Sequence, residues 1–144
     1  MEPVEEIDFS EVELNKTATI LSLTNAIFRS YITSDYTKIL AMLFSLFMKN
    51  KIVKRDRTNI NICINNIDVV NKSLIDMFVN PELDKFSFLK IKTFENEIFL
   101  LEMYLTNIGM IDVLIDEFNS IHENIDKIYT LFLSSKITSY LIYR

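Results

Sequence analysis

The helical character of this chain is clearest in residues 17–49, which read TATILSLTNAIFRSYITSDYTKILAMLFSLFMK. Large apolar side chains return there every three or four residues, first at Ile20, Leu23, Ile27 and Tyr31 and then at Ile39, Met42, Leu43, Leu46 and Phe47. This spacing places them on one face of a helix. Because Ser34-Asp35 separates the two sets and offers a side-chain cap, we expect two helices here, the second ending at Lys49.

The composition favours a compact helical domain over an enzyme. The 144 residues include one glycine, Gly109, and two prolines, while 49% of them are hydrophobic. Glycine provides the tight turns and close backbone approaches of phosphate-binding loops, and this chain has little material for such sites. A chain of 144 residues fits one domain with a buried core. We therefore expect residues 17–144 to form a single helical domain without catalytic turnover.

Residues 1–16 differ in character from the rest of the chain. They are rich in Asp and Glu and poor in large apolar side chains, so we expect an acidic, loosely ordered arm. An acidic N-terminus is unlike a secretory signal, and no apolar run reaches the ~18 residues of a membrane span. These features predict a cytoplasmic protein. A net charge of −5 argues against a general nucleic-acid binder and against a protein that adheres to anionic membranes.

Helical spacing continues through most of the remaining sequence. It is found around residues 69–78, 98–108, 111–118 and 125–132. Asn80-Pro81-Glu82 is a typical helix start, and Ser120-Ile121-His122-Glu123 matches a capping box. The chain as a whole predicts a mainly α, single-domain bundle of six to seven helices.

Two segments leave an α+β alternative open. Residues 59–65 read NINICIN, a strict alternation of polar and apolar side chains that is typical of a strand. Leu89, Ile91 and Thr93 alternate with lysines in residues 86–94, and Glu95-Asn96-Glu97 would then be a turn. The alternative fold is α+β, with a small antiparallel hairpin around 59–65 and 86–105.

The candidate catalytic groups are few. A nucleophilic system would need the one histidine, His122, beside Cys63 or a serine. Because His122 falls within the capping box, we expect a solvated surface imidazole. A structural zinc site needs about four nitrogen or sulfur ligands, and the chain has one histidine and one cysteine. The sequence thus predicts no catalytic residue, no metal site and no cofactor.

One stretch of the chain is strongly basic. Lys49, Lys51, Lys54, Arg55 and Arg57 fall in what reads as a connector between helices. One interpretation is an anion-binding patch at Lys51, Lys54 and Arg55. The other is the placement of cations near a helix C-terminus, where they offset the helix dipole.

Aromatic residues and methionines are too numerous to fit one narrow core stripe. We expect most of them in the core and some in a groove that binds an amphipathic partner helix. The residues predicted to line this partner groove are Leu43, Phe44, Phe47, Met48, Leu101, Leu105, Asn107, Ile108 and Gly109.

The tetrad Asn107-Ile108-Gly109-Met110 matches two of the four residues of the Asn-Trp-Gly-Arg motif found in cellular Bcl-2 proteins. Together with the succession of helices, it makes residues 17–133 resemble the Bcl-2-like proteins of poxviruses, whose aromatic-glycine pair can close the central helix. The resemblance implies a viral protein that evades host immunity or inhibits apoptosis by binding host proteins. The expected partner presents an amphipathic helix or is a signalling adaptor. Met110 stands where the motif has an arginine, which pairs with an aspartate of a bound pro-death helix. Without this charge-assisted contact, the chain departs from the members of the family that bind pro-death helices.

Other functions remain open at this stage. If the strands exist, the chain resembles small poxvirus proteins that assist virion-membrane assembly and bind phosphoinositide headgroups, with the basic stretch as the headgroup site. A third hypothesis is an obligate structural subunit of a larger complex. A homodimer and a membrane contact are also left open by the sequence.

Overall fold

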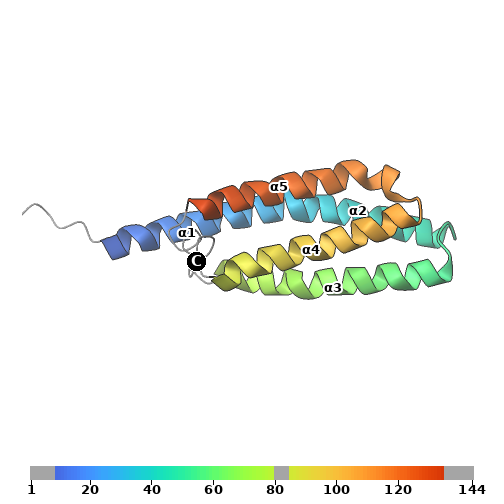
Figure 1. The fold of residues 1–144 in the computed structure, drawn as a ribbon, viewed down its shortest axis with the longest axis horizontal. Helices are drawn as coiled ribbons and strands as arrows, with labels where there is room; N and C mark the ends of the chain where they lie inside the picture. Colours follow the sequence, from blue (N-terminus) through green and yellow to red (C-terminus); the bar gives the residue numbers. More distant parts are fainter. Residues whose placement is uncertain (1–8, 80–84, 135–144) are drawn as a thin grey trace, which may run out of the picture.

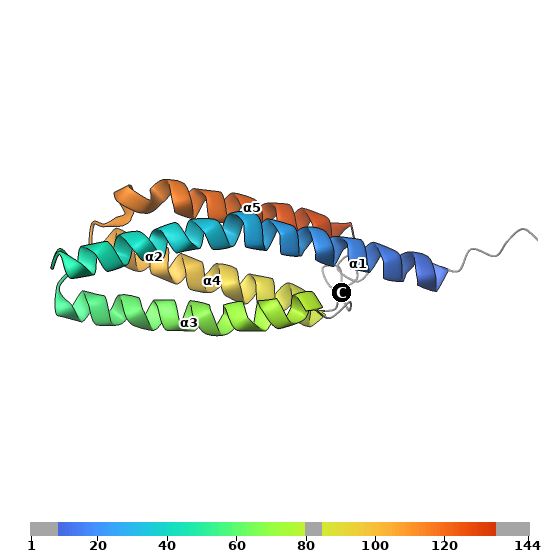
Figure 2. The same cartoon turned by 180° about the vertical axis from the view of Figure 1, so that it is seen from behind.

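The computed structural model describes residues 9–79 and 85–134, which form an antiparallel bundle of four helical rods (Figure 1). The first rod joins α1 (Phe9–Ile27), the π-helical turn η1 (Phe28–Ile32) and α2 (Thr33–Met48). The others are α3 (Lys54–Val79), α4 (Lys85–Asn107) and α5 (Ile115–Leu133), the last preceded by the 3₁₀ turn η2 (Ile111–Leu114). Figure 2 shows the bundle from behind.

The prediction of a mainly α helical bundle is confirmed. The described ranges contain no strand, so the α+β alternative with a hairpin around 59–65 and 86–105 is wrong. The predicted count of six to seven helices is not confirmed, since four rods account for the described residues. The predicted helix start at Asn80-Pro81 lies outside these residues, as do positions 1–8 and 135–144.

The first rod is continuous through the predicted break at Ser34-Asp35. Ile27 and Thr33 both have right-handed helical backbone angles, and no side chain caps either boundary of the π-helical turn. Thr24, Phe28, Ile32 and Tyr36 are all buried at a constant spacing of four residues. A four-residue repeat drifts by about 40° per step around a helix of 3.6 residues per turn, and the wider π-helical turn takes up this drift. One buried face is thereby kept through α1 and α2.

The rods pack side by side around one apolar core. α3 packs on α4, while α5 packs on α4 and on all three segments of the first rod. Phe28 lies where the rods converge, its ring centroid 5.5 Å from that of Phe78 in α3 and 5.2 Å from that of Phe94 in α4. The T-shaped geometry of the second pair is a favoured arrangement for aromatic rings. The short connections of residues 49–53 and 108–110 are typical of antiparallel neighbours in a bundle.

The two segments that suggested strands are interior parts of helices. In α3, Ile60, Ile64 and Ile67 are buried, whereas Ile62 is exposed, which is the spacing of a helical face. In α4, residues 91, 94, 98, 101 and 105 are buried at helical spacing, and the predicted turn at 95–97 lies inside the helix. The alternation at 59–65 is local, and the longer helical periodicity determines the structure.

The predicted capping box is also wrong. α5 begins at Ile115, so Ser120 lies within the helix and caps nothing. Its hydroxyl instead donates a hydrogen bond of 2.6 Å to the Asp35 carboxylate of α2. The buried Asn124 amide donates to the Ser120 carbonyl at 2.9 Å. These polar side chains therefore contribute to the packing of α5 on the first rod.

Alanine substitutions at three isoleucines distinguish the helix from a strand at residues 59–65. In a strand, Ile60, Ile62 and Ile64 would share one face, but in α3 the exposed fraction is 0% for Ile60 and 53% for Ile62. Ile60→Ala and Ile64→Ala should each lower the free energy of unfolding by about 2–5 kcal/mol, because each leaves a cavity in the core. Ile62→Ala should change it by about 0.5 kcal/mol or less. Urea unfolding provides the measurement, and equal losses at all three positions would contradict the helix.

Candidate functional site

Four of the nine residues predicted to line a partner groove are buried. Leu43, Leu101 and Leu105 have an exposed fraction of 0%, and Phe47 is also part of the core. These side chains face the neighbouring rods, because each belongs to the buried stripe of its helix. A partner would reach them only if the rods separated, so in this arrangement they hold the bundle together and line no open groove.

The two remaining α2 residues of that prediction are exposed. Phe44 lies beside Phe47, with ring centroids 5.9 Å apart, and Met48 ends the helix with an exposed fraction of 85%. Phe44 and Met48 are therefore available to a partner, but they are separate from the buried leucines with which the sequence grouped them.

The other predicted residues, Asn107, Ile108 and Gly109, form the C-terminal cap of α4. Gly109 has a φ of 74°, and its amide donates to the Thr106 carbonyl at 3.1 Å. The Met110 amide donates to the Leu105 carbonyl at 2.8 Å. This pair of bonds around a left-handed residue is the Schellman motif, which satisfies the last carbonyls of a helix. α4 accordingly ends at Asn107, directly before this cap.

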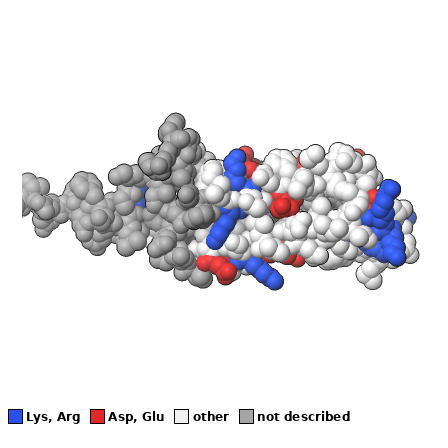
Figure 3. Space-filling view, turned by 60° about the horizontal axis from the view of Figure 1, so that its bottom comes forward, with Lys and Arg blue, Asp and Glu red and all other residues white. Residues whose placement is uncertain are grey.

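The basic residues gather at one end of the bundle, where α2 passes into α3. We call Lys49, Lys51, Lys54, Arg55 and Arg57 the basic tip, and Figure 3 shows it as a blue patch at the end of the molecule. Lys51, Lys54 and Arg55, the predicted anion patch, are all exposed. Asp56 is the one carboxylate within residues 49–57, and it lies 3.7 Å from the Arg55 guanidinium. The chain thus brings the predicted patch residues together.

The solvent side of α4 carries a second exposed surface, which combines four large apolar side chains with polar ones such as Lys92, Thr93 and Asn96. Leu89, Phe99, Leu100 and Met103, which we call the α4 outer face, have exposed fractions of 44–59%. The core side of the same helix is apolar as well, with Ile91, Phe94 and Ile98 buried. The three glutamates of α4 are only partly exposed, and the exposed residues between 88 and 107 include no acidic side chain. Large apolar side chains in water opposite an apolar core side are typical of a helix with a second partner.

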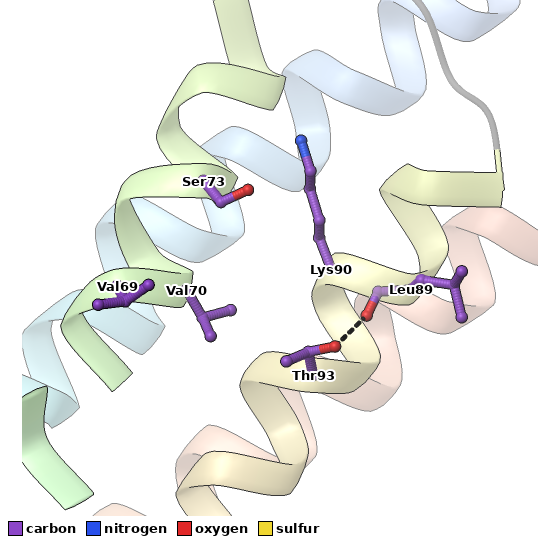
Figure 4. A pocket seen from close by; sticks show the side chains of 6 residues that line it. All are labelled: Val69, Val70, Ser73, Leu89, Lys90 and Thr93. Atoms are coloured by element: carbon purple, nitrogen blue, oxygen red, sulfur yellow. Dashed lines mark hydrogen bonds between the residues drawn. The ribbon is translucent and has the colours of Figure 1, made fainter. Parts of the chain in front are cut away.

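Two depressions adjoin the α4 outer face. One, of about 310 Å³, lies between α3 and α4 and is lined by Val69, Val70, Ser73, Leu89, Lys90 and Thr93. Figure 4 shows the Lys90 side chain standing in the space between the two helices, with Val70 and Ser73 on the opposite wall. The other, of about 490 Å³, is lined by Phe99, Glu102, Met103, Thr106 and Asn107. The two hollows therefore lie towards opposite ends of α4.

His122 packs against two residues that line the second depression, and it is not the solvated imidazole that the sequence predicted. Its ring stacks on Phe99 with centroids 4.3 Å apart, and its Nε2 lies 2.5 Å from a carboxylate oxygen of Glu102. The side chain is largely buried, and its Nδ1 has no hydrogen-bond partner. These contacts fix Phe99 and Glu102 of α4 against α5.

The α3–α4 seam contains a polar cluster and the cysteine. The Tyr104 hydroxyl donates to the Asp56 carboxylate at 2.7 Å and accepts from the Asn59 amide at 2.9 Å. Burial, with a smaller contribution from the charge of Glu97, raises the pKa of the Cys63 thiol. A raised pKa keeps the thiol protonated near neutral pH, and the protonated form is a poor nucleophile. Within residues 9–79 and 85–134, no three side chains of His, Cys, Asp or Glu are grouped to hold a metal ion.

The α4 outer face was largely missed by sequence reasoning. Leu89 enters the sequence analysis only as part of the alternative strand at 86–94, and Leu100 is not assigned to either face of the helix. A helical wheel over residues 88–107 would have found it, because the apolar residues occupy more of the circumference than one neighbour can cover.

Comparisons with known proteins do not assign this surface. No family model matches the chain, and neither a curated protein nor a solved structure matches it. No helix in the described part of the chain is long and apolar enough to cross a membrane.

Substitution of Gly109 tests its role as a helix cap. A Cβ at this position would meet no neighbouring atom within 4 Å, so the cost of Gly109→Ala is that of the left-handed backbone. We expect the free energy of unfolding to fall by roughly 1–2 kcal/mol for alanine and by less for Gly109→Asn, since asparagine adopts this conformation more readily. Urea unfolding of both variants checks the order. An alanine variant as stable as the parent chain would rule out the cap.

Proposed function

We propose that this chain is a non-enzymatic protein-interaction module that binds an amphipathic helix of a partner along the α4 outer face. The observation that carries the proposal is the exposure of four large apolar side chains on α4, a helix whose core side is already apolar. Exposed apolar patches of this kind mark interaction sites on proteins. An amphipathic helix can cover such a stripe with apolar residues spaced three and four apart.

The charges beside the α4 outer face favour a partner helix with an acidic residue. Lys90 lines the depression between α3 and α4, and Lys92 is exposed on the same helix. No described carboxylate forms an ion pair with either lysine. The opposite charge on the partner would therefore meet cations that have no competing partner among the described residues.

The length of the α4 outer face also suits a helix. Leu89 and Met103 are separated by fourteen positions in α4, which corresponds to about 21 Å at 1.5 Å per residue. A partner helix of about four turns has this length and would reach from one depression to the other.

The non-enzymatic assignment is supported by the surroundings of Cys63 and His122, the two side chains on which nucleophilic catalysis would depend. The Cys63 thiol has a raised pKa and lies at the α3–α4 seam. The His122 ring is engaged by Phe99 and Glu102. Both side chains contribute to packing between helices, and neither is aligned with a second group as nucleophile and base.

The resemblance to poxvirus Bcl-2-like proteins extends the proposal to a setting. In it, the chain is a viral protein of the host cytoplasm, with a Bcl-2-like bundle, whose partner is a host apoptotic or innate-signalling protein. Support comes from the helical bundle and from the Gly109 cap at the end of α4. The four rods and Met110 are departures from the family pattern. Met110 lacks the charge that pairs with an aspartate of a pro-death helix, and this favours signalling adaptors as partners. The obligate subunit is the alternative proposal, and in it the same face binds a permanent neighbour.

Fluorescence anisotropy with labelled amphipathic peptides tests the interaction. The panel consists of pro-death helices and helices of host signalling adaptors, each with an acidic residue. For a peptide that binds, Leu100→Gln and Met103→Gln should each weaken binding about tenfold, or about 1.4 kcal/mol, because each removes apolar contact area. Lys90→Gln should weaken binding only of the peptide that retains its acidic residue, and not of its glutamine analogue.

Leu23→Gln on α1 is the matched control, because Leu23 is an exposed leucine of another helix. It should leave peptide binding unchanged. The proposal fails if no peptide binds, or if Leu23→Gln weakens binding as much as the α4 substitutions do.

A further inference from the structure

The basic tip carries positive charge that the described carboxylates neutralise only in part. Of its five cations, only Arg55 has an ion pair with a described carboxylate, that of Asp56. Asp56 is also the acceptor of the Tyr104 hydroxyl and is largely buried. The carboxylate is thus directed into the α3–α4 seam, and the exposed side of the tip stays cationic.

The position of these cations in the fold makes the binding of an anion more favourable. Lys49 and Lys51 follow the C-terminus of α2, where positive charge is favourable. Lys54, Arg55 and Arg57 lie in the first turn of α3, where the positive end of the helix dipole repels cations. The interpretation as charges that offset a helix C-terminus therefore covers only Lys49 and Lys51. An anion bound at the tip would relieve the repulsion of the other three.

The backbone of the tip is held in one conformation. Asn50 has a φ of 54°, and the Lys51 amide donates to the Leu46 carbonyl at 3.0 Å, which closes α2. Ile52 is buried and anchors the connection in the core. The Arg57 amide donates to the Val53 carbonyl at 2.9 Å as α3 begins. The cations are therefore displayed on a fixed turn.

Two apolar side chains are exposed within the same turn. Met48 and Val53 have exposed fractions of 85% and 62%, and no large apolar side chain of described exposure exceeds Met48. A soluble polyanion would bind the cations and leave these two side chains in water. The interface of a lipid bilayer accommodates both kinds, with phosphates for the cations and an apolar layer beneath them.

We infer that the basic tip docks this protein on an anionic lipid surface, with Met48 and Val53 inserted at the interface. The net charge of −5 directs this contact to the tip, because the remainder of the chain is repelled by an anionic leaflet. α4 runs along the bundle and the turn from α2 into α3 lies at one end (Figure 1), so docking by this end leaves most of the length of α4 free.

Co-sedimentation of the full chain with vesicles tests the inference. We expect binding to phosphatidylcholine vesicles that contain phosphatidylserine and none to phosphatidylcholine alone. Lys51→Gln, Lys54→Gln and Arg55→Gln should each lower the partition coefficient roughly fivefold, because a basic residue at an anionic leaflet contributes about 1 kcal/mol. Lys127→Gln on α5 is the control, since Lys127 is an exposed lysine of another helix, and it should change little. Circular dichroism confirms that each variant retains its helices.

Met48→Gln and Val53→Gln distinguish a lipid surface from a soluble polyanion. They should weaken vesicle binding and leave any binding to a single-stranded oligonucleotide or to inorganic phosphate unchanged. Equal binding to both vesicle compositions would overturn the inference, as would vesicle binding that is insensitive to Met48 and Val53. Leu100→Gln should leave vesicle binding intact, so failure of this inference and failure of the proposed helix binding can be told apart.

Discussion

Burial of Phe28 between Phe78 and Phe94 is the contact on which the arrangement of the bundle depends, because it joins the first rod to both α3 and α4. The same π-helical turn packs against α5, so all four rods meet there. The four-residue spacing of Thr24, Phe28, Ile32 and Tyr36 does not fit an ideal α-helix. The π-helical turn is the local adjustment that lets one helix present all four side chains to the core. Side-chain packing thus outweighs the regular α-helical hydrogen-bond pattern of the backbone at this turn.

The sequence contains enough information for the helical class and for one helix end. Apolar spacing over residues 17–49 and the single glycine after α4 lead directly to α1–α2 and to the Gly109 cap. The break expected at Ser34-Asp35 does not occur, because a residue able to cap a helix is also tolerated inside one when its neighbours are buried. The strand expected at 59–65 fails for a related reason. Seven alternating residues are outweighed by the helical spacing of Ile60, Ile64 and Ile67 within a 26-residue helix.

The candidate site was harder to predict because burial depends on which neighbours a helix has. Apolar residues look alike in sequence whether they face the core or the solvent, and so Leu101 and Leu105 were placed in a groove while Leu100 was overlooked. Charged residues are easier to place, since they stay at the surface, and the basic tip was found from the sequence alone. What the structure adds is the separation of the two surfaces. The α4 outer face belongs to α4 and the basic tip to the turn from α2 into α3, and the two surfaces share no residue.

The apolar solvent side of α4 has a consequence for the free protein in a crowded cell. Four large apolar side chains in water attract similar surfaces on any chain nearby, including newly made copies of this one. If the proposed partner covers this face, the solubility of the chain depends on how fast that partner is supplied relative to its own synthesis. Copies made in excess would be the first to aggregate or to be removed by proteolysis, and matched expression of the two proteins would set the usable amount of each.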